Sequence, residues 1–546
     1  MKKLSLIILG LMLFSALNAQ DQGVFSGNFQ SNFSVFQLDS NIGAYESPQY
    51  LSDKSSSEAW LFLNYQLKGF NLSARYDLFN NSNLLNPTGS YTGHGLGFWQ
   101  LKKKIDKLEL TVGSFYDQFG SGLVFRAYEG RLLGLDYAVE GMHANYDITD
   151  NWFVKAFTGR QKGFISERFS TAPQVLKGVN SEYLLSTENG NTFNFGASFV
   201  NRTLDDGTMN TITAEISNYE SDNDKFDPKY NVYAYNGYAS ATLGPVNLFA
   251  EYVTKTEEAI RAKSGKLELH SGSIIYAGAN FSKNKLGKNK KGGIGIDVQY
   301  RKIDKFPFRV HPNASLLNGF VTYQPSLTRQ GTYRMLARYN APAQELGEEG
   351  IQVDLTYTIK KGRTIKANFS NITDLEGEKL FSEKFFQYSH KINKKWKGKL
   401  GLQSVFYNQQ VYEVKDSTYH DVHTLTPFGE LTYKMTRRNS VRFEAQYLMT
   451  GEDLGSFVNA ILEFNFSPHY TFAISDMVNV DPVRHEGSPI SDDIVHYYSV
   501  FAKYNIHTTA FTLAYIKQVE GINCTGGICR VEPAFSGVRF TITTNF

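Results

Sequence analysis

The sequence predicts an all-β protein, a large antiparallel transmembrane β-barrel of about 24 strands (about 22–26). Three observations predict this fold. Apolar and polar residues alternate with period two along most of the chain. Short connections alternate with long ones. The chain ends in an amphipathic strand with a terminal aromatic residue. We expect in-folded loops to constrict the lumen of this barrel.

The first twenty residues read MKKLSLIILGLMLFSALNAQ. Lys2 and Lys3 precede an apolar stretch, Leu4 to Phe14, that is too short to span a bilayer, and Ala19 ends a region of small residues. This pattern predicts a secretory signal peptide at residues 1–19, with the barrel formed by residues 20–546. No later stretch reaches the 18 or so apolar residues that a transmembrane helix requires.

The composition agrees with a membrane barrel. Tyr (33) and Phe (41) are abundant, Gly (46) is frequent and Pro (14) is rare. The 56 Lys and Arg residues nearly balance the 53 Asp and Glu residues, so we expect no nucleic-acid partner. The alternative is a large secreted β-sandwich or propeller, and a propeller requires repeats at a fixed period, which we do not find.

The alternation is clear in Ile351 to Ile359 (IQVDLTYTI), where odd positions are apolar or aromatic and even positions are polar. A tight turn, KKGR, leads into TIKANFS, where Ile365, Ala367 and Phe369 share one face. Such strands have one apolar and one polar face. In a membrane barrel the polar face lines the lumen, and the sheet closes because lipid offers its backbone no hydrogen-bond partner.

The connections fall into two classes, as they do at the two ends of outer-membrane barrels. Eleven short turns, with one strand entering first and one leaving last, give about 24 strands. The expected short turns lie near residue 70 and at 102–106, 148–151, 204–207, 243–245, 284–293, 360–363, 392–397, 435–439, 467–469 and 506–508. The longer connections include 36–55, 80–91, 117–137, 161–190, 302–348 and 478–492.

The last stretch, GVRFTITTNF, places the apolar residues Val538, Phe540, Ile542 and Phe546 on one face. An amphipathic final strand that ends in Phe resembles the signal by which the barrel-insertion machinery recognises outer-membrane proteins. We therefore expect the cell outer membrane of a Gram-negative bacterium as the location, with outer-membrane lipids around the barrel.

A barrel of this size would be an open channel unless part of the chain blocks its lumen, because barrels of 16–18 strands already enclose an aqueous channel. Alternation begins near residue 23, which leaves no room for an N-terminal plug domain. The first candidate for an in-folded constriction is the segment from Ser114 to Gly141, which mixes apolar residues with charges. Its charged residues are Arg126, Glu129, Arg131, Asp136 and Glu140. The alternative is a surface loop with ordinary ion pairs.

The second candidate runs from Lys302 to Glu348. Its Arg329, Arg334 and Arg338 are placed to pair with lumen carboxylates, and charges in a constriction set pore selectivity. The alternative is that part of this stretch forms another strand pair with a shorter loop.

We find no motif of an enzyme or of a cofactor site, and we expect neither. His420, Asp421 and His423 lie together in YHDVH, but their spacing is not diagnostic of a metal site, and surface residues are the plainer interpretation.

The two cysteines lie in INCTGGICRV near the C-terminus. Exported thiols without metal-ligand companions most often form disulfides, so we predict a bond between Cys524 and Cys529. Gly526 and Gly527 allow the chain to fold back between them. A redox-active pair is the alternative, although neither cysteine lies at a recognisable helix N-terminus.

The runs FYDQFGSGLVFRAYEGRLLGLD, TYQPSLTRQGTY and GINCTGGICRVEPAFSGVRFTITTNF together resemble an uncharacterised Bacteroidetes outer-membrane family, domain of unknown function 6029. The resemblance spans nearly the whole mature chain and implies an outer-membrane barrel, with no established activity.

Two functions follow as hypotheses. The first is a channel or transporter for small polar solutes, gated by the in-folded segments. The second is a non-transporting scaffold subunit of an outer-membrane complex with surface or periplasmic lipoprotein partners. The polar residues on alternate strand faces favour the first, since a wet lumen requires them.

Overall fold

The computed structural model describes residues 23–163, 167–287, 291–314, 317–483, 494–525 and 528–546, with backbone alone at 522–525 and 528–529. The predicted signal peptide at residues 1–19 lies outside these ranges. Among the described residues, no helix combines the length and apolar composition needed to cross a membrane.

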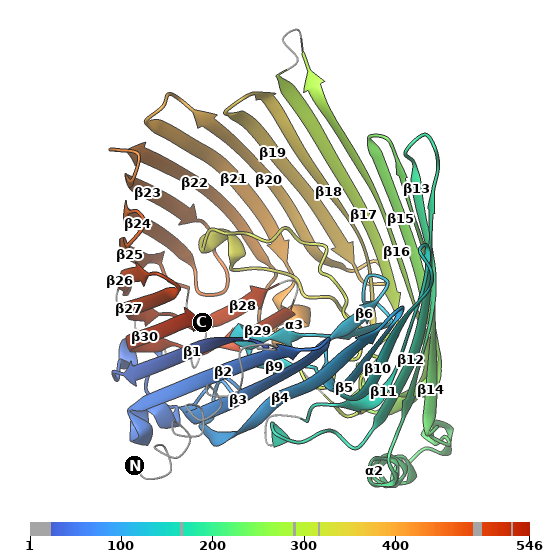
Figure 1. Ribbon diagram of the computed structural model, residues 1–546. Coiled ribbons are helices and arrows are strands. Elements are labelled where there is room, and N and C mark those ends of the chain that lie inside the picture. Colours follow the sequence, from blue (N-terminus) through green and yellow to red (C-terminus); the bar gives the residue numbers. More distant parts are fainter. Residues whose placement is uncertain (1–22, 164–166, 288–290, 315–316, 484–493, 526–527) are drawn as a thin grey trace.

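Twenty-four antiparallel strands form one closed barrel, as the sequence predicts (Figure 1). The last barrel strand pairs with the first, from Asn28 opposite Asn545 to Phe36 opposite Gly537, and this pairing closes the sheet. The barrel strands are β1 (Val24–Phe36), β2 (Ser55–Leu67), β3 (Phe70–Ser82), β4 (Tyr91–Ile105), β5 (Leu108–Phe115), β10 (Val139–Thr149), β11 (Trp152–Gln161), β12 (Val175–Ser186), β13 (Thr192–Thr203), β14 (Asn231–Leu243), β15 (Val246–Arg261), β16 (Leu267–Leu286), β17 (Gly292–Asp304), β18 (Gly347–Lys360), β19 (Arg363–Thr373), β20 (Lys379–Lys391), β21 (Trp396–Tyr407), β22 (Val422–Lys434), β23 (Asn439–Leu448), β24 (Ser456–Phe466), β25 (Tyr470–Asp481), β26 (His496–Ile506), β27 (Thr509–Gln518) and β30 (Phe535–Asn545).

The remaining elements are short and lie in the long connections. The strands among them are β6 (Asp117–Phe119), β7 (Phe125–Ala127), β8 (Glu129–Gly130), β9 (Leu135–Asp136), β28 (Gly521–Thr525) and β29 (Ile528–Glu532). The helices are η2 (Ser40–Ile42), η3 (Gln49–Asp53), η4 (Arg131–Leu133), α2 (Asp206–Ser217), η6 (Asp222–Asp224), η7 (Met335–Ala337) and α3 (Gln409–Tyr412).

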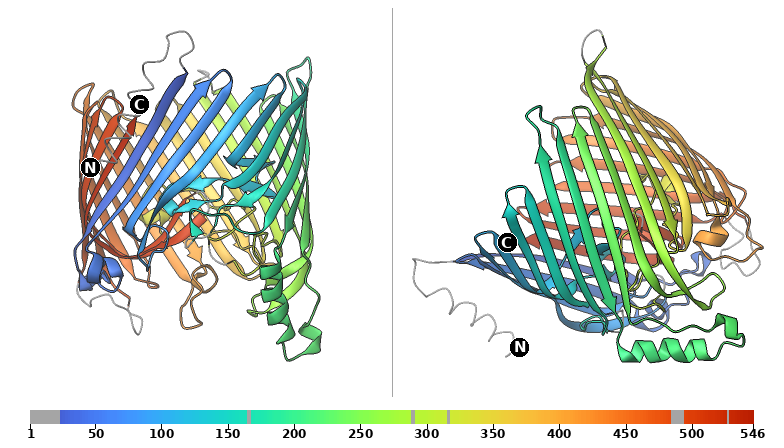
Figure 2. Two further views of the ribbon diagram at one scale, coloured as in Figure 1. Left: turned by 60° about the horizontal axis from the view of Figure 1, so that its bottom comes forward. Right: turned by 90° about the vertical axis from the view of Figure 1, so that its right-hand side faces the viewer.

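Short turns gather at one end of the barrel and long connections at the other, where α2 protrudes (Figures 1 and 2). One predicted turn is wrong. Residues 204–207 begin a helix, because Asp205 caps α2 by accepting a hydrogen bond from the Thr208 amide at 3.1 Å. The predicted long connection 161–190 is also wrong, because it contains all of β12. The short turn that the prediction missed follows this strand, where the Thr187 amide donates to the Asn191 carbonyl at 2.9 Å.

The outer face of the barrel is apolar. Exposed aromatic residues also gather within four residues of the strand ends that meet the short turns: Tyr65, Phe70, Trp152, Tyr357, Trp396 and Tyr470. An apolar band with aromatic girdles is typical of transmembrane barrels. Exposed residues of the band include Phe33, Leu72, Leu101, Phe195, Tyr252, Phe386, Leu400, Phe443, Ile474 and Leu513.

Candidate functional site

Two long connections fold into the barrel, and we call them the first in-folded segment (116–138) and the second in-folded segment (305–346) (Figure 1). The first joins β5 to β10 and the second joins β17 to β18. Each leaves the wall and returns to it at residues that are register partners, Phe115 with Val139 and Asp304 with Gly347. Both segments are therefore insertions at the tips of otherwise ordinary hairpins.

The two segments meet inside the barrel along a seam of backbone hydrogen bonds, aromatic contacts and apolar packing. The Arg126 amide donates to the Val321 carbonyl at 2.8 Å, and the Tyr323 amide donates to the Gly122 carbonyl at 2.9 Å. The Arg126 guanidinium also lies over the Tyr323 ring, 4.0 Å from its centroid. These contacts make one continuous body out of two insertions that lie about 200 residues apart in the chain.

Buried ion pairs tie the first in-folded segment to the wall at β3. Arg75 on β3 lies 2.7 Å from Glu129 and 2.9 Å from Asp136, and Lys162, just after β11, lies 2.8 Å from Asp136. Burial alone raises the pKa of a carboxyl group, but Lys162, Arg168 and Arg75 together hold the pKa of Asp136 well below its ordinary value. Asp136 is therefore ionised, and its negative charge balances the positive charges of the cations around it.

Further contacts spread the first in-folded segment over a wide arc of the wall. Arg131 donates to Gln30 on β1 at 3.2 Å, and Lys155 on β11 lies 2.8 Å from Asp117. The Ser121 amide donates to Glu251 on β15 at 3.1 Å. The segment therefore crosses the lumen between strands on different sides of the barrel.

The second in-folded segment binds the next arc, from β20 to β23. Arg329 lies 3.3 Å from Glu383 on β20, and the Tyr333 hydroxyl donates to Glu430 on β22 at 3.2 Å. The Met335 amide donates to the Gln446 side chain on β23 at 2.8 Å. One turn of η7 thus docks on polar residues of the lumen wall.

The same segment is fastened to the rim by Asp453, in the connection between β23 and β24. Asp453 lies 3.1 Å from both Arg338 and Lys415 and accepts a hydrogen bond from the Tyr339 hydroxyl at 2.9 Å. Burial would raise the pKa of Asp453, but the nearby Arg338 and Lys415 lower it to about 2.

Arg334 differs from the other charged residues of the two segments. Within the described ranges it has neither a hydrogen bond nor an ion pair from its guanidinium, and its neighbours include Arg338 and Tyr497. Burial, reinforced by Arg338, lowers the pKa of Arg334 to about 10, so the group remains a cation at neutral pH.

Apolar packing completes both segments. Phe119, Leu123 and Phe125 of the first pack with wall residues such as Phe157 and Val200, and all five are nearly inaccessible to solvent. Leu327, Met335 and Leu336 of the second join a cluster that includes Phe385 and Tyr407. Burial of this kind is the dominant stabilising contribution in protein interiors, so neither segment is a loose loop.

The predicted constriction residues divide into two groups. Arg126, Glu129, Arg131, Asp136 and Arg329 all make the contacts described above, and Arg334 lies beside them without a partner. Glu140 does not join this network. His143 of the same strand contacts Asp117 in the lumen, so the strand alternation turns Glu140 to the outer face, where it accepts a hydrogen bond from Trp99 Nε1 at 3.2 Å.

Sequence reasoning missed every partner of these residues on the wall. Arg75, Glu383, Glu430 and Gln446 follow the polar alternation of their strands, and this alternation is the one signal that marks them as lumen residues. Asp453 carries no such signal, since it lies in the connection between β23 and β24, outside the alternation of the strands.

Cys524 and Cys529 lie in the β28–β29 hairpin, where they are direct register partners. Their side chains lie outside the described residues, so the disulfide stays a prediction. The predicted targeting residues Val538, Phe540 and Ile542 belong to β30, and Phe546 follows it. Over the described part of the chain, no group of three His, Cys, Asp or Glu residues is arranged to hold a metal ion.

Comparisons with known proteins give a family and a set of distant barrels. A family model described as "Family of unknown function (DUF6029)" matches residues 1–546, and no curated protein matches the chain. The P pilus usher (PapC) translocation pore has a TM-score of 0.42 at 9% identity, covering 96% of this chain and 99% of its own. The siderophore receptor PirA from Pseudomonas aeruginosa has a TM-score of 0.41 at 9% identity, covering 97% and 81%. The OccK5 (OpdH) structure from the same species has a TM-score of 0.33 at 11% identity, covering 84% and 97%.

Proposed function

The chain belongs to the DUF6029 family, and we propose that it is an outer-membrane channel for small polar solutes, gated by the two in-folded segments. The apolar outer band and its aromatic girdle support the membrane location. The polar and charged wall residues that bind the segments support a lumen filled with water where the segments leave space.

The seam between the segments carries the gating proposal. Each segment is bound to its own arc of wall by buried ion pairs, whereas backbone hydrogen bonds, the Arg126 stacking, the ring contact of Tyr137 with Phe320 and apolar packing join one segment to the other. Parting the seam leaves the strands of the barrel in place, because both segments are insertions at hairpin tips.

Conductance across a planar bilayer tests this proposal. We would replace residues 116–138 by a four-residue glycine-containing turn, because Phe115 and Val139 are already register partners. The expected result is a several-fold rise in single-channel conductance over the wild type. The same turn in place of residues 205–229 is the matched control, since Thr203 and Asn231 are register partners and α2 protrudes beyond the barrel end (Figure 1).

A barrel that stays silent after both in-folded segments are replaced would rule out the channel. That outcome would favour the scaffold alternative, for which stoichiometric co-purification of a lipoprotein is the direct assay.

A further inference from the structure

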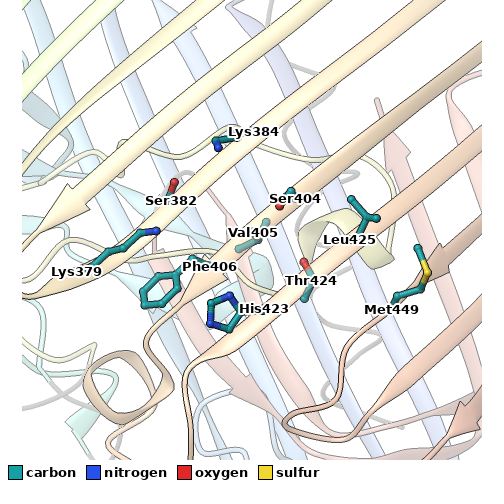
Figure 3. A pocket seen from close by; sticks show the side chains of 10 residues that line it. All are labelled: Lys379, Ser382, Lys384, Ser404, Val405, Phe406, His423, Thr424, Leu425 and Met449. Atoms are coloured by element: carbon teal, nitrogen blue, oxygen red, sulfur yellow. The ribbon is translucent and has the colours of Figure 1, made fainter.

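A groove on the outer face of the barrel has a composition that a lipid-facing surface does not explain. It has a volume of about 350 Å³ and lies on β20, β21 and β22 near the long-loop end (Figure 3). That volume is more than ten times the roughly 30 Å³ that one water occupies in the liquid. Its lining includes Lys379, Ser382, Lys384, Ser404, Leu425 and Met449.

The register shows that the groove faces away from the lumen. Glu383 and Gln403 are turned to the lumen, where they bind the second in-folded segment, so the alternate residues Lys384 and Ser404 lie on the outer face. Ser404 is the direct register partner of Lys384. Lys384 is exposed there among apolar neighbours that include Phe369 and Phe386.

A β-bulge brings the second lysine to the same face. The register between β19 and β20 shifts between Ile372 and Thr373, so Leu380 has no partner and both Leu380 and Phe381 are buried. Lys379 is thereby turned outward, and its amine lies 4.3 Å from the centroid of the outward Phe406 ring. Bulges re-aim side chains in this way. Figure 3 shows Lys379 extending between Ser382 and Phe406.

These two cations have no carboxylate partner within the ranges that the structure describes. A cation on the lipid face of a barrel is unfavourable unless an anion accompanies it. Two ammonium groups together with the Ser382 and Ser404 hydroxyls provide the charge and the donors that a phosphate group prefers. Leu425 and Met449 continue the groove with an apolar surface suited to an acyl chain.

We infer that this groove binds the phosphate of a lipid in the membrane leaflet at the long-loop end. Lys379 and Lys384 contact the phosphate, the two serine hydroxyls donate hydrogen bonds to it, and the adjoining apolar surface holds the start of a chain. The inference depends on the membrane location of the barrel and not on passage of solutes through it.

Native mass spectrometry of the purified protein in detergent tests the inference. The probes are lipid A, which carries two phosphates, an uncharged galactolipid of matched chains, and inorganic phosphate alone. The expected result is retention of one lipid A molecule with about tenfold preference over the galactolipid, and a loss of about tenfold in Lys379→Gln/Lys384→Gln. The Lys379→Arg/Lys384→Arg variant should retain the lipid.

The matched control is Lys394→Gln/Lys395→Gln, which removes the same charge from the short turn at the other end of the β20–β21 hairpin, where both residues are exposed. Equal retention of the galactolipid, or an equal loss in the control variant, would overturn the inference. Inorganic phosphate that binds as tightly as lipid A would also overturn it, because the site would then be one for a free anion.

Discussion

Arg75 and Asp136 form a buried ion pair, 2.9 Å between guanidinium and carboxylate, that joins the barrel wall to the first in-folded segment. Their side chains are 2% and 0% exposed. The same guanidinium reaches Asp77 at 2.7 Å and Glu129 at 2.7 Å, so one cation serves three carboxylates. Removing one member of such a buried group leaves the others uncompensated.

We therefore predict that Arg75→Gln loosens the first in-folded segment, with a local cost of roughly 3–5 kcal/mol. The measurement is protease cleavage within residues 116–138, together with the frequency of open-channel events, and both should rise. The control is Lys503→Gln in β26, for which the structure gives no ion pair over its described ranges. Unchanged cleavage in Arg75→Gln would show that apolar packing alone holds the segment.

The contact of Asp453 with Arg338 and Lys415 predicts a particular pH dependence. A carboxyl group whose pKa is lowered on folding contributes stability above its ordinary pKa of 3.8, and that contribution is lost as pH falls through the folded value of about 2. The second in-folded segment should stay closed from pH 8 to about pH 4 and open as pH approaches 2. Current recorded across that range is the measurement.

The same contact predicts that Asp453→Asn opens the channel already at neutral pH, because Arg338 and Lys415 lose their shared anion. Asp416→Asn is the control, since Asp416 is exposed and, among the described residues, its carboxylate accepts hydrogen bonds only from Thr418 of its own turn. A variant Asp453→Asn that stays closed would place the fastening of this segment elsewhere.

The guanidinium of Arg334 leads us to predict that the pore prefers anions over cations. An arginine without an acceptor in a constriction attracts anions, and it stays protonated at neutral pH because its pKa is about 10. In a salt gradient, Arg334→Gln should move the reversal potential toward cation preference, and Arg334→Lys should restore most of the wild-type value. An unchanged reversal potential in Arg334→Gln would mean that solutes do not pass this residue.

The fold was predictable because each of its signals is local. Alternation such as that of Ile351 to Ile359 marks a strand by itself, and the edges of a sheet in lipid have to close. The predicted number of strands agrees with the structure although two connections were misjudged. Residues 204–207 read as a turn because Asp and Gly favour both turns and helix starts, and the missed turn at 187–191 offset that error.

For each contact of the candidate site, the sequence predicted the residue on the in-folded segment but not its partner on the barrel wall. The composition of residues 114–141 indicated a packed segment, and the structure shows that it is one. Its partners depend on strand register and on the curvature of the closed sheet, which bring Arg75 to Glu129 across 54 residues of chain. The outer groove was missed for the same reason, since the bulge at Leu380 puts Lys379 on a face that simple alternation does not assign to it.

The two cysteines give a prediction that rests on the backbone. Cys524 and Cys529 are register partners across a tight hairpin at the long-loop end. We expect thiol labelling of whole cells to fail without reductant and to succeed after reduction. Closing so small a loop contributes about 2 kcal/mol in the chain-entropy model, so the double Cys→Ser variant should still assemble. Free labelling of both cysteines in untreated cells would exclude the disulfide.

Phe546, which follows β30, leads us to predict a larger effect on assembly than on stability. Phe546 exchanges backbone hydrogen bonds with Gly27, at 2.7 and 3.0 Å, and its ring centroid lies 6.2 Å from that of Phe25. These contacts lie at the end of the strand pairing between β30 and β1, which already has nine register pairs. Deleting Phe546 should therefore change the thermal stability of the purified barrel little, yet we propose that it lowers the amount inserted in the outer membrane, because an amphipathic strand followed by an aromatic residue resembles the signal for barrel insertion. Substituting Phe25 by Ala is the matched control, since it removes the same ring contact and leaves Phe546 intact. Equal membrane levels for the deletion and the wild type would show that Phe546 acts only in closing the sheet.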